Sequence, residues 1–126
     1  MIRRLLLLLG LLCVLGGSAQ AQYVMDIGSL ITALRVADFS RDLDNLDRAQ
    51  SVYVTRLSEI AGVRVGHPVL DQTLARRERH LHYLRAIIAQ NRAAMKALAI
   101  HNEALADVVF LTTTDDGTAM LYVDDR

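Results

Sequence analysis

The feature that most constrains the fold is a long run of regularly spaced apolar residues between Pro68 and Ala106. Apolar side chains recur there every three or four positions, at Leu70, Leu74, Leu81, Leu84, Ile88, Met95, Leu98 and Leu105. This spacing places an apolar stripe along one side of an α-helix. A single helix over this run would be roughly 57 Å long, so we expect a second long element to cover the stripe.

A second pattern of the same kind precedes it. From Ile27 onward, apolar residues recur at helical spacing through Val36, Phe39, Leu43, Leu46, Tyr53, Leu57 and Ile60. The connection at 62–68 contains two glycines and the one proline of the chain, which favour a helix end and a new helix start. We therefore predict an antiparallel hairpin of two helices at about 27–61 and 68–106. Ser40 could instead start a separate helix as its cap.

Three polar residues interrupt the apolar stripe of the second predicted helix. They are Arg77, Asn91 and Asn102. Polar residues on the seam between two helices often fix the register and the number of partners. We interpret these three residues as seam positions of the helical hairpin.

The last segment has a strand pattern instead. β-branched and aromatic residues fill 108–114 and 118–123, on either side of Asp116-Gly117. Asp-Gly between two such runs is a strong signal for a hairpin with a two-residue turn. The predicted fold class is therefore mainly α, with a small C-terminal β-hairpin at about 108–123.

Residues 1–21 have the pattern of a cleaved signal peptide. Two arginines precede an apolar run at 5–15, and the small-residue tripeptide Ala19-Gln20-Ala21 follows. We predict one mature domain at 22–126, periplasmic or secreted. The apolar run is too short to span a bilayer, so we expect no stable membrane insertion after cleavage.

Composition restricts the classes of function. The chain has 14 Lys+Arg and 14 Asp+Glu, and removal of the two leader arginines leaves a slightly acidic chain, unlike a typical nucleic-acid-binding protein. The single cysteine, Cys13, lies in the leader, so the mature chain would form no disulfide. A phosphate loop and a nucleophile elbow are absent from the sequence. We predict a protein that is not an enzyme and needs no cofactor.

Positive charge gathers around the predicted connection between the helices. Arg64, Arg76, Arg77 and Arg79 form a predicted basic tip. Such a tip could contact an anionic envelope surface or an acidic partner. The alternative is a solvated face without a target.

A second ridge of small and apolar residues lies beside the stripe and continues into the β-hairpin. Its predicted interaction residues are Tyr83, Ile87, Ala94, Ala97, Ala104, Val108, Phe110 and Tyr122. The same chain could cover this ridge. Alternatively, a protein partner or a second copy could do so, and two copies would form a four-helix homodimer.

Glu78 and His82 are the candidate metal ligands. They lie four residues apart and would share one side of a helix, which suits zinc or copper. A third ligand would have to come from a second copy of the chain. The commoner interpretation of the four histidines is exposure on a charged helix. A periplasmic metal-binding or stress-responsive helical factor is therefore the alternative function.

The predicted mature start, Tyr23-Val24-Met25-Asp26-Ile27-Gly28-Ser29-Leu30, is followed directly by amphipathic helices. It resembles the opening of the minor pilus subunits of conjugative type IV secretion systems. The resemblance covers about the first third of the mature chain and carries over no functional residues. It implies an assembly role at a transfer apparatus. The main hypothesis is thus an exported, non-enzymatic binding or assembly protein.

Overall fold

The computed structural model describes residues 24–63 and 65–126, so the predicted signal peptide lies outside the described residues. In chain order the elements are α2 (Ile27–Val36), α3 (Ser40–Asp47), β1 (Ser51–Arg56), η1 (Leu57–Glu59), α4 (Pro68–Arg76), α5 (Glu78–Ile88), α6 (Arg92–Ile100), η2 (Leu105–Asp107), β2 (Val108–Thr113) and β3 (Thr118–Val123). This is a mixed α/β fold, and the predicted mainly α hairpin is wrong. Within the described residues, no helix combines the length and apolar character that a membrane crossing requires.

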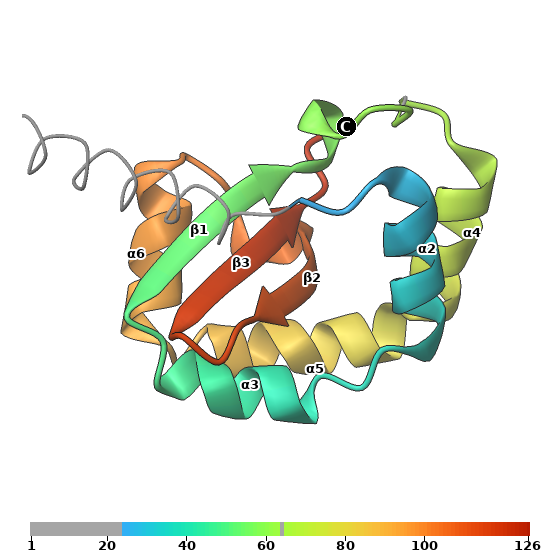
Figure 1. Cartoon of the computed structure of the whole chain (residues 1–126). Helices are drawn as coiled ribbons and strands as arrows, with labels where there is room; N and C mark the ends of the chain where they lie inside the picture. The colour runs from blue at the N-terminus through green and yellow to red at the C-terminus, as the bar shows by residue number, and fades with distance from the viewer. Residues whose placement is uncertain (1–23, 64) are drawn as a thin grey trace, which may run out of the picture.

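The strands form one three-stranded sheet in the order β1-β3-β2 (Figure 1). The central strand β3 is parallel to β1 and antiparallel to β2. Its pairing with β1 runs from Ser51 opposite Thr118 to Arg56 opposite Val123. Because three α-helices, two 3-10 helices and β2 separate β1 from β3 in the chain, the sheet joins distant parts of the sequence.

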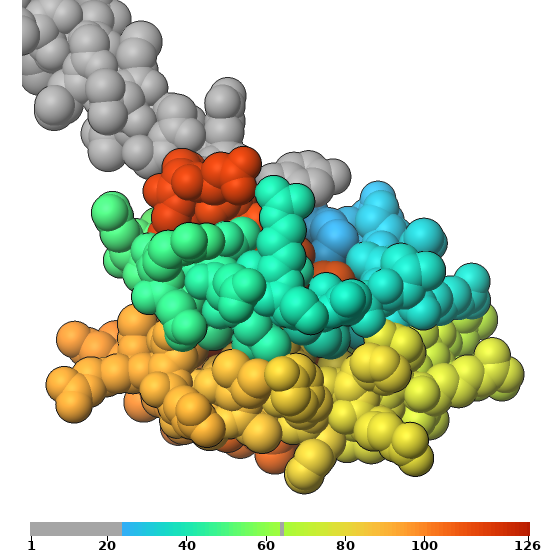
Figure 2. Space-filling view, turned by 90° about the horizontal axis from the view of Figure 1, so that it is seen from below, coloured from blue at the N-terminus to red at the C-terminus, as the bar shows by residue number. Residues whose placement is uncertain are grey.

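Helices lie on both sides of the molecule. In Figure 2, α4, α5 and α6 form one layer, coloured lime to orange, and β1, α3 and α2 form the opposite layer, coloured green to blue. Helix α6 packs on β1 and α3 packs on β2, whereas α2 packs on α4. The α2–α4 pair lies at the end of the molecule away from α6 (Figure 1).

The core is centred on β3, which is buried on both faces. Residues 119–123 are each at most 5% exposed. Phe110 makes edge-to-face contacts with Phe39 and Tyr122, with ring centroids 5.4 and 6.0 Å apart. The Tyr122 hydroxyl accepts a hydrogen bond of 3.2 Å from the backbone nitrogen of Met25. These contacts fix the segment before α2 and the α2–α3 connection on the sheet.

The predicted helix 27–61 is divided into two helices and a strand. Helix α2 ends at Val36, and the next residue, Ala37, is extended with φ −60° and ψ 124°. Asp38 Oδ1 then accepts hydrogen bonds from Ser40 N and Oγ at 3.0 and 2.6 Å. A separate helix, α3, begins at Ser40, as the alternative prediction had it, but the cap position is occupied by Phe39 and not by Ser40. The β-branched residues of β1 favour a strand, and pairing with β3 outweighs their helical spacing.

The predicted helix 68–106 is divided at the polar residues that interrupt the stripe. Arg77 lies between α4 and α5 with φ −101° and ψ 6°. Asn91 is the N-cap of α6, where its Oδ1 accepts a hydrogen bond of 2.9 Å from Ala94 N. Asn102 follows α6 with φ +55°, a left-handed conformation that asparagine tolerates. The interpretation of these residues as seam positions is wrong, because they mark helix boundaries.

Helix α4 begins as the sequence predicts. Pro68 occupies a first-turn position, where a missing backbone N–H has no cost. His67 caps the helix, because its Nδ1 accepts a hydrogen bond of 3.2 Å from Leu70 N.

The C-terminal strands β2 and β3 form an antiparallel pair within the predicted region 108–123. The connection between them has four residues, 114–117, and Thr114 N donates a hydrogen bond of 2.9 Å to Thr118 O. Gly117 has φ +90°, which favours glycine. The predicted two-residue turn at Asp116-Gly117 is therefore wrong.

Candidate functional site

A basic pocket lies where the end of α2 packs on α4. It is lined by Arg35 of α2, by Gln72, Thr73 and Arg76 of α4, and by Arg77 at the α4–α5 junction, and its volume is about 200 Å³. Gln72 and Arg76 are four positions apart, as are Thr73 and Arg77, so these residues lie along one side of the helix. The packing of α2 on α4 adds Arg35 to them.

Arg77 connects the two sides of the basic pocket. One guanidinium nitrogen, Nη2, donates a hydrogen bond to the carbonyl oxygen of Ala37, directly after α2. The Nε of Arg77 is buried and has no hydrogen-bond partner among the described residues. A buried donor without an acceptor costs roughly 1–3 kcal/mol. A water or a ligand oxygen would satisfy this N–H.

The charge of the basic pocket is not neutralised within residues 24–63 and 65–126. There, Arg35, Arg76 and Arg77 form no ion pair. By contrast, the arginines at 56, 85 and 126 are each paired with carboxylates. Because like charges gathered at one site repel one another, an anion in the pocket is favourable.

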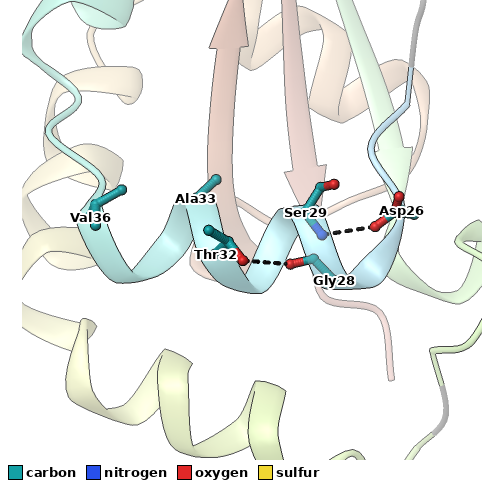
Figure 3. Close-up of a pocket in the computed structure, with 6 residues that line it drawn as sticks. All are labelled: Asp26, Gly28, Ser29, Thr32, Ala33 and Val36. Atoms are coloured by element: carbon teal, nitrogen blue, oxygen red, sulfur yellow. Dashed lines mark hydrogen bonds between the residues drawn. The ribbon is translucent and has the colours of Figure 1, made fainter.

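A shallow hollow of about 540 Å³ follows the outer side of α2 and is lined by Asp26, Gly28, Ser29, Thr32, Ala33 and Val36 (Figure 3). Asp26 Oδ1 accepts a hydrogen bond of 2.8 Å from Ser29 N, and this contact lowers the pKa of Asp26. Thr32 Oγ1 donates to Gly28 O at 3.0 Å. These polar groups satisfy one another within the helix, so the hollow offers little recognition chemistry.

A third hollow of about 330 Å³ lies at the α2–α3 connection. It is lined by residues 37–40 together with His80 and Tyr83 of α5. Hydrogen bonds from Ser40 are the main cause that lowers the pKa of Asp38, and the charge of His80 contributes less. Ala37 lines this hollow, and its carbonyl oxygen accepts the hydrogen bond from Arg77 of the basic pocket.

A polar hollow of about 260 Å³ has apolar side chains in its lining and five charged residues, which are Glu78, Arg85, Asp107, Asp124 and Arg126. Arg85 pairs with Glu78 at 3.1 Å. Arg126 pairs with Asp71 at 2.7 Å and with Asp124 at 2.8 Å. Because these charges already neutralise one another, we interpret this cluster as structural.

The predicted basic tip is only partly brought together. Arg76 and Arg77 line the basic pocket, Arg79 is exposed on α5, and Arg64 lies outside the described residues. The sequence did not predict that Arg35 belongs to this site. A continuous helix over 27–61 would have placed Arg35 at the end of the hairpin away from Arg76 and Arg77. The Asp38-Phe39-Ser40 sequence, a turn-forming segment before α3, was the signal that the chain folds back there.

The candidate metal ligands Glu78 and His82 are both exposed. Glu78 Oε1 is paired with Arg85 Nη1 at 3.1 Å. Among the described residues, no group of three or more metal-binding side chains is close enough to hold an ion. Within residues 24–63 and 65–126, Glu78 and His82 therefore have no third metal-binding side chain close enough to complete a site.

The predicted interaction residues occupy very different environments. Five of them, Ala94, Ala97, Val108, Phe110 and Tyr122, are at most 7% exposed. Ile87 is partly buried, Ala104 is exposed, and Tyr83 is 59% exposed. The small side chains of Ala94 and Ala97 are used inside the chain, in the helix that packs on β1.

Comparisons of the chain with protein-family models, with curated proteins and with solved structures found no match. We therefore infer a function from the geometry and the charge of the sites described above.

Proposed function

We propose that this chain is an exported binding or assembly protein that recognises an acidic segment of a protein partner through the basic pocket. The observation that carries the proposal is the position of Arg35, Arg76 and Arg77 around one hollow, without a paired carboxylate among the described residues. Export is supported by the signal-peptide pattern at 1–21.

The concave shape of the basic pocket favours a protein partner over a lipid surface. A hollow of about 200 Å³ can admit a side-chain carboxylate of aspartate or glutamate. A membrane surface instead attracts clusters of basic residues that lie on it. Guanidinium groups match carboxylates well, because two parallel N–H donors can reach the two oxygens.

Binding of a glutamate-rich peptide tests the proposal. We expect a fluorescently labelled peptide of this kind to bind the purified chain in an anisotropy titration, and to bind more weakly as salt is added. The Arg35→Gln/Arg76→Gln double variant removes two charge-assisted contacts. Its affinity for the peptide should be lower by at least about tenfold.

A matched control removes the same charge outside the basic pocket. Arg79 and Arg92 are exposed and do not line the pocket, so the Arg79→Gln/Arg92→Gln variant should keep most of the affinity. An equal loss in both double variants contradicts a site at the pocket. The proposal also fails if the wild-type chain binds phosphatidylglycerol vesicles but not the peptide.

A further inference from the structure

We infer that the basic pocket seats a single oxyanion group, a carboxylate or a phosphate, on Arg77 through directed hydrogen bonds. The inference rests on the proposed function and narrows it. General attraction of an acidic segment requires positive charge alone, whereas a seat for one oxyanion requires donors in a fixed orientation.

The orientation of Arg77 is fixed before any ligand arrives. Its Nη2 donates to Ala37 O, and the side chain is half-buried at the junction of α4 and α5. A guanidinium is planar, so fixing one nitrogen restricts the directions of the remaining N–H donors. An oxyanion therefore meets a pre-ordered donor and does not have to immobilise a freely moving side chain.

The unsatisfied Nε of Arg77 points to an acceptor that the described chain does not supply. This nitrogen is buried without a hydrogen-bond partner there, although the same residue lines the basic pocket. The inference requires the exposed side chains that line the pocket to shift so that an oxyanion oxygen reaches this nitrogen. The oxygen would remove the cost of the buried donor and receive a charge-assisted hydrogen bond.

The other lining residues define what the seat can accept. Arg35 and Arg76 come from two helices and add positive charge from either side. Thr73 Oγ1 donates its proton to Val69 O at 2.7 Å, so this hydroxyl has no free proton for an anion. The donors that remain are the arginines and the amide of Gln72, and a volume of about 200 Å³ suits one small group.

Nitrogen-15 NMR of the full wild-type chain tests the seat directly. Acetate and inorganic phosphate are titrated separately into the labelled protein, at a constant ionic strength set with chloride. We expect the Arg77 Nε–H resonance to shift and to saturate with at least one of the two ions, while that of Arg79 stays in place. The two titrations distinguish a carboxylate seat from a phosphate seat.

The Arg77→Lys variant separates geometry from charge, because lysine keeps the charge but has no Nε–H and no planar fork. We expect it to bind the effective ion at least about tenfold more weakly, and Arg79→Lys to bind like wild type. If Arg77→Lys does not fold, the titration of the wild-type chain still tests whether an oxyanion binds at Arg77 Nε.

Two outcomes would overturn the inference: an Arg77 Nε–H resonance that neither ion moves, or equal ion affinity in Arg77→Lys and wild type. Binding of the glutamate-rich peptide shows whether only the inference about Arg77 fails or whether the proposed function fails as well. If the wild-type chain binds the peptide and Arg77→Lys binds it equally well, charge recognition stands and the seat is rejected. If the wild-type chain does not bind the peptide, the proposed function is rejected.

Discussion

At the scale of single residues, one arginine joins the end of the sheet to a distant helix. The Arg126 side chain is 7% exposed and donates to Asp124 at 2.8 Å and to Asp71 of α4 at 2.7 Å. The hydrogen bond from Arg126 is the main cause that lowers the pKa of Asp124, and it also raises the pKa of Arg126. The folded state therefore favours the charged form of Asp124.

This coupling predicts how stability depends on pH. The ordinary pKa of the Asp124 carboxyl is 3.8, and folding lowers it. The ionised group therefore stabilises the fold above pH 3.8, and this stabilisation is lost as the pH falls through the lowered value. We expect Asp124→Asn to reduce the free energy of unfolding by about 1 kcal/mol at pH 7. In urea denaturation, the difference from wild type should shrink below pH 3.8.

An exposed ion pair provides the control. Asp115 lies 3.6 Å from Arg41, with both side chains at least 81% exposed. Asp115→Asn should change the free energy of unfolding little at any pH, because exposed pairs contribute little. A constant Asp124→Asn difference across the pH series would show that the substitution acts through packing and not through the charge.

At the scale of elements, asparagines lie at both ends of α6, with Asn91 as its N-cap and Asn102 just after its last turn. After α6, Asn102 N donates to Ala99 O at 3.1 Å and Glu103 N donates to Leu98 O at 2.9 Å. This is the hydrogen-bond pattern of a helix end closed by a left-handed residue. Glycine adopts that conformation without the steric cost of a Cβ atom.

Substitution at this helix end should therefore change stability in opposite directions. We expect Asn102→Gly to raise the free energy of unfolding by about 0.5 kcal/mol, and Asn102→Ala to lower it by a similar amount. Thermal and urea unfolding monitored by circular dichroism measure both changes. An alanine variant more stable than the glycine variant would rule out a left-handed helix end at this position.

The helices and strands differ in how far the sequence could predict them. Pro68 and the C-terminal strands carry short-range signals, and they were placed correctly. Asn91 and Asn102 fit the three-to-four spacing of a continuous stripe, so local spacing alone could not identify them as helix ends. For β1, helical and strand periods compete over six residues, and the choice depends on pairing with β3 far along the chain.

At the scale of the whole molecule, the basic pocket exists because the chain reverses direction after α2. Arg76 and Arg77 were predicted to share a basic surface, since they are neighbours on one helix. Arg35 could not be added from spacing, because its position depends on the break at Ala37 and on the packing of α2 against α4. Sequence therefore indicated the charge of the site but not its concave shape.

The central position of β3 predicts the effect of truncation. Removal of residues 118–126 takes away the strand that pairs with both neighbours, and most of its side chains are buried. We expect this shortened chain to show no cooperative unfolding in circular dichroism. A chain that lacks Arg126 alone should unfold cooperatively with reduced stability. Cooperative unfolding of the first variant would contradict a core organised on β3.

The parallel pairing of β1 with β3 also has a consequence for the timing of folding. During synthesis β1 emerges early, but its partner strand follows every helix of the described chain. Contacts between such distant segments form slowly, because a long loop must close first. The sheet therefore cannot assemble while β3 is still being made. For a chain that we propose to be exported, this order leaves the sheet unformed until the last strand has been synthesised.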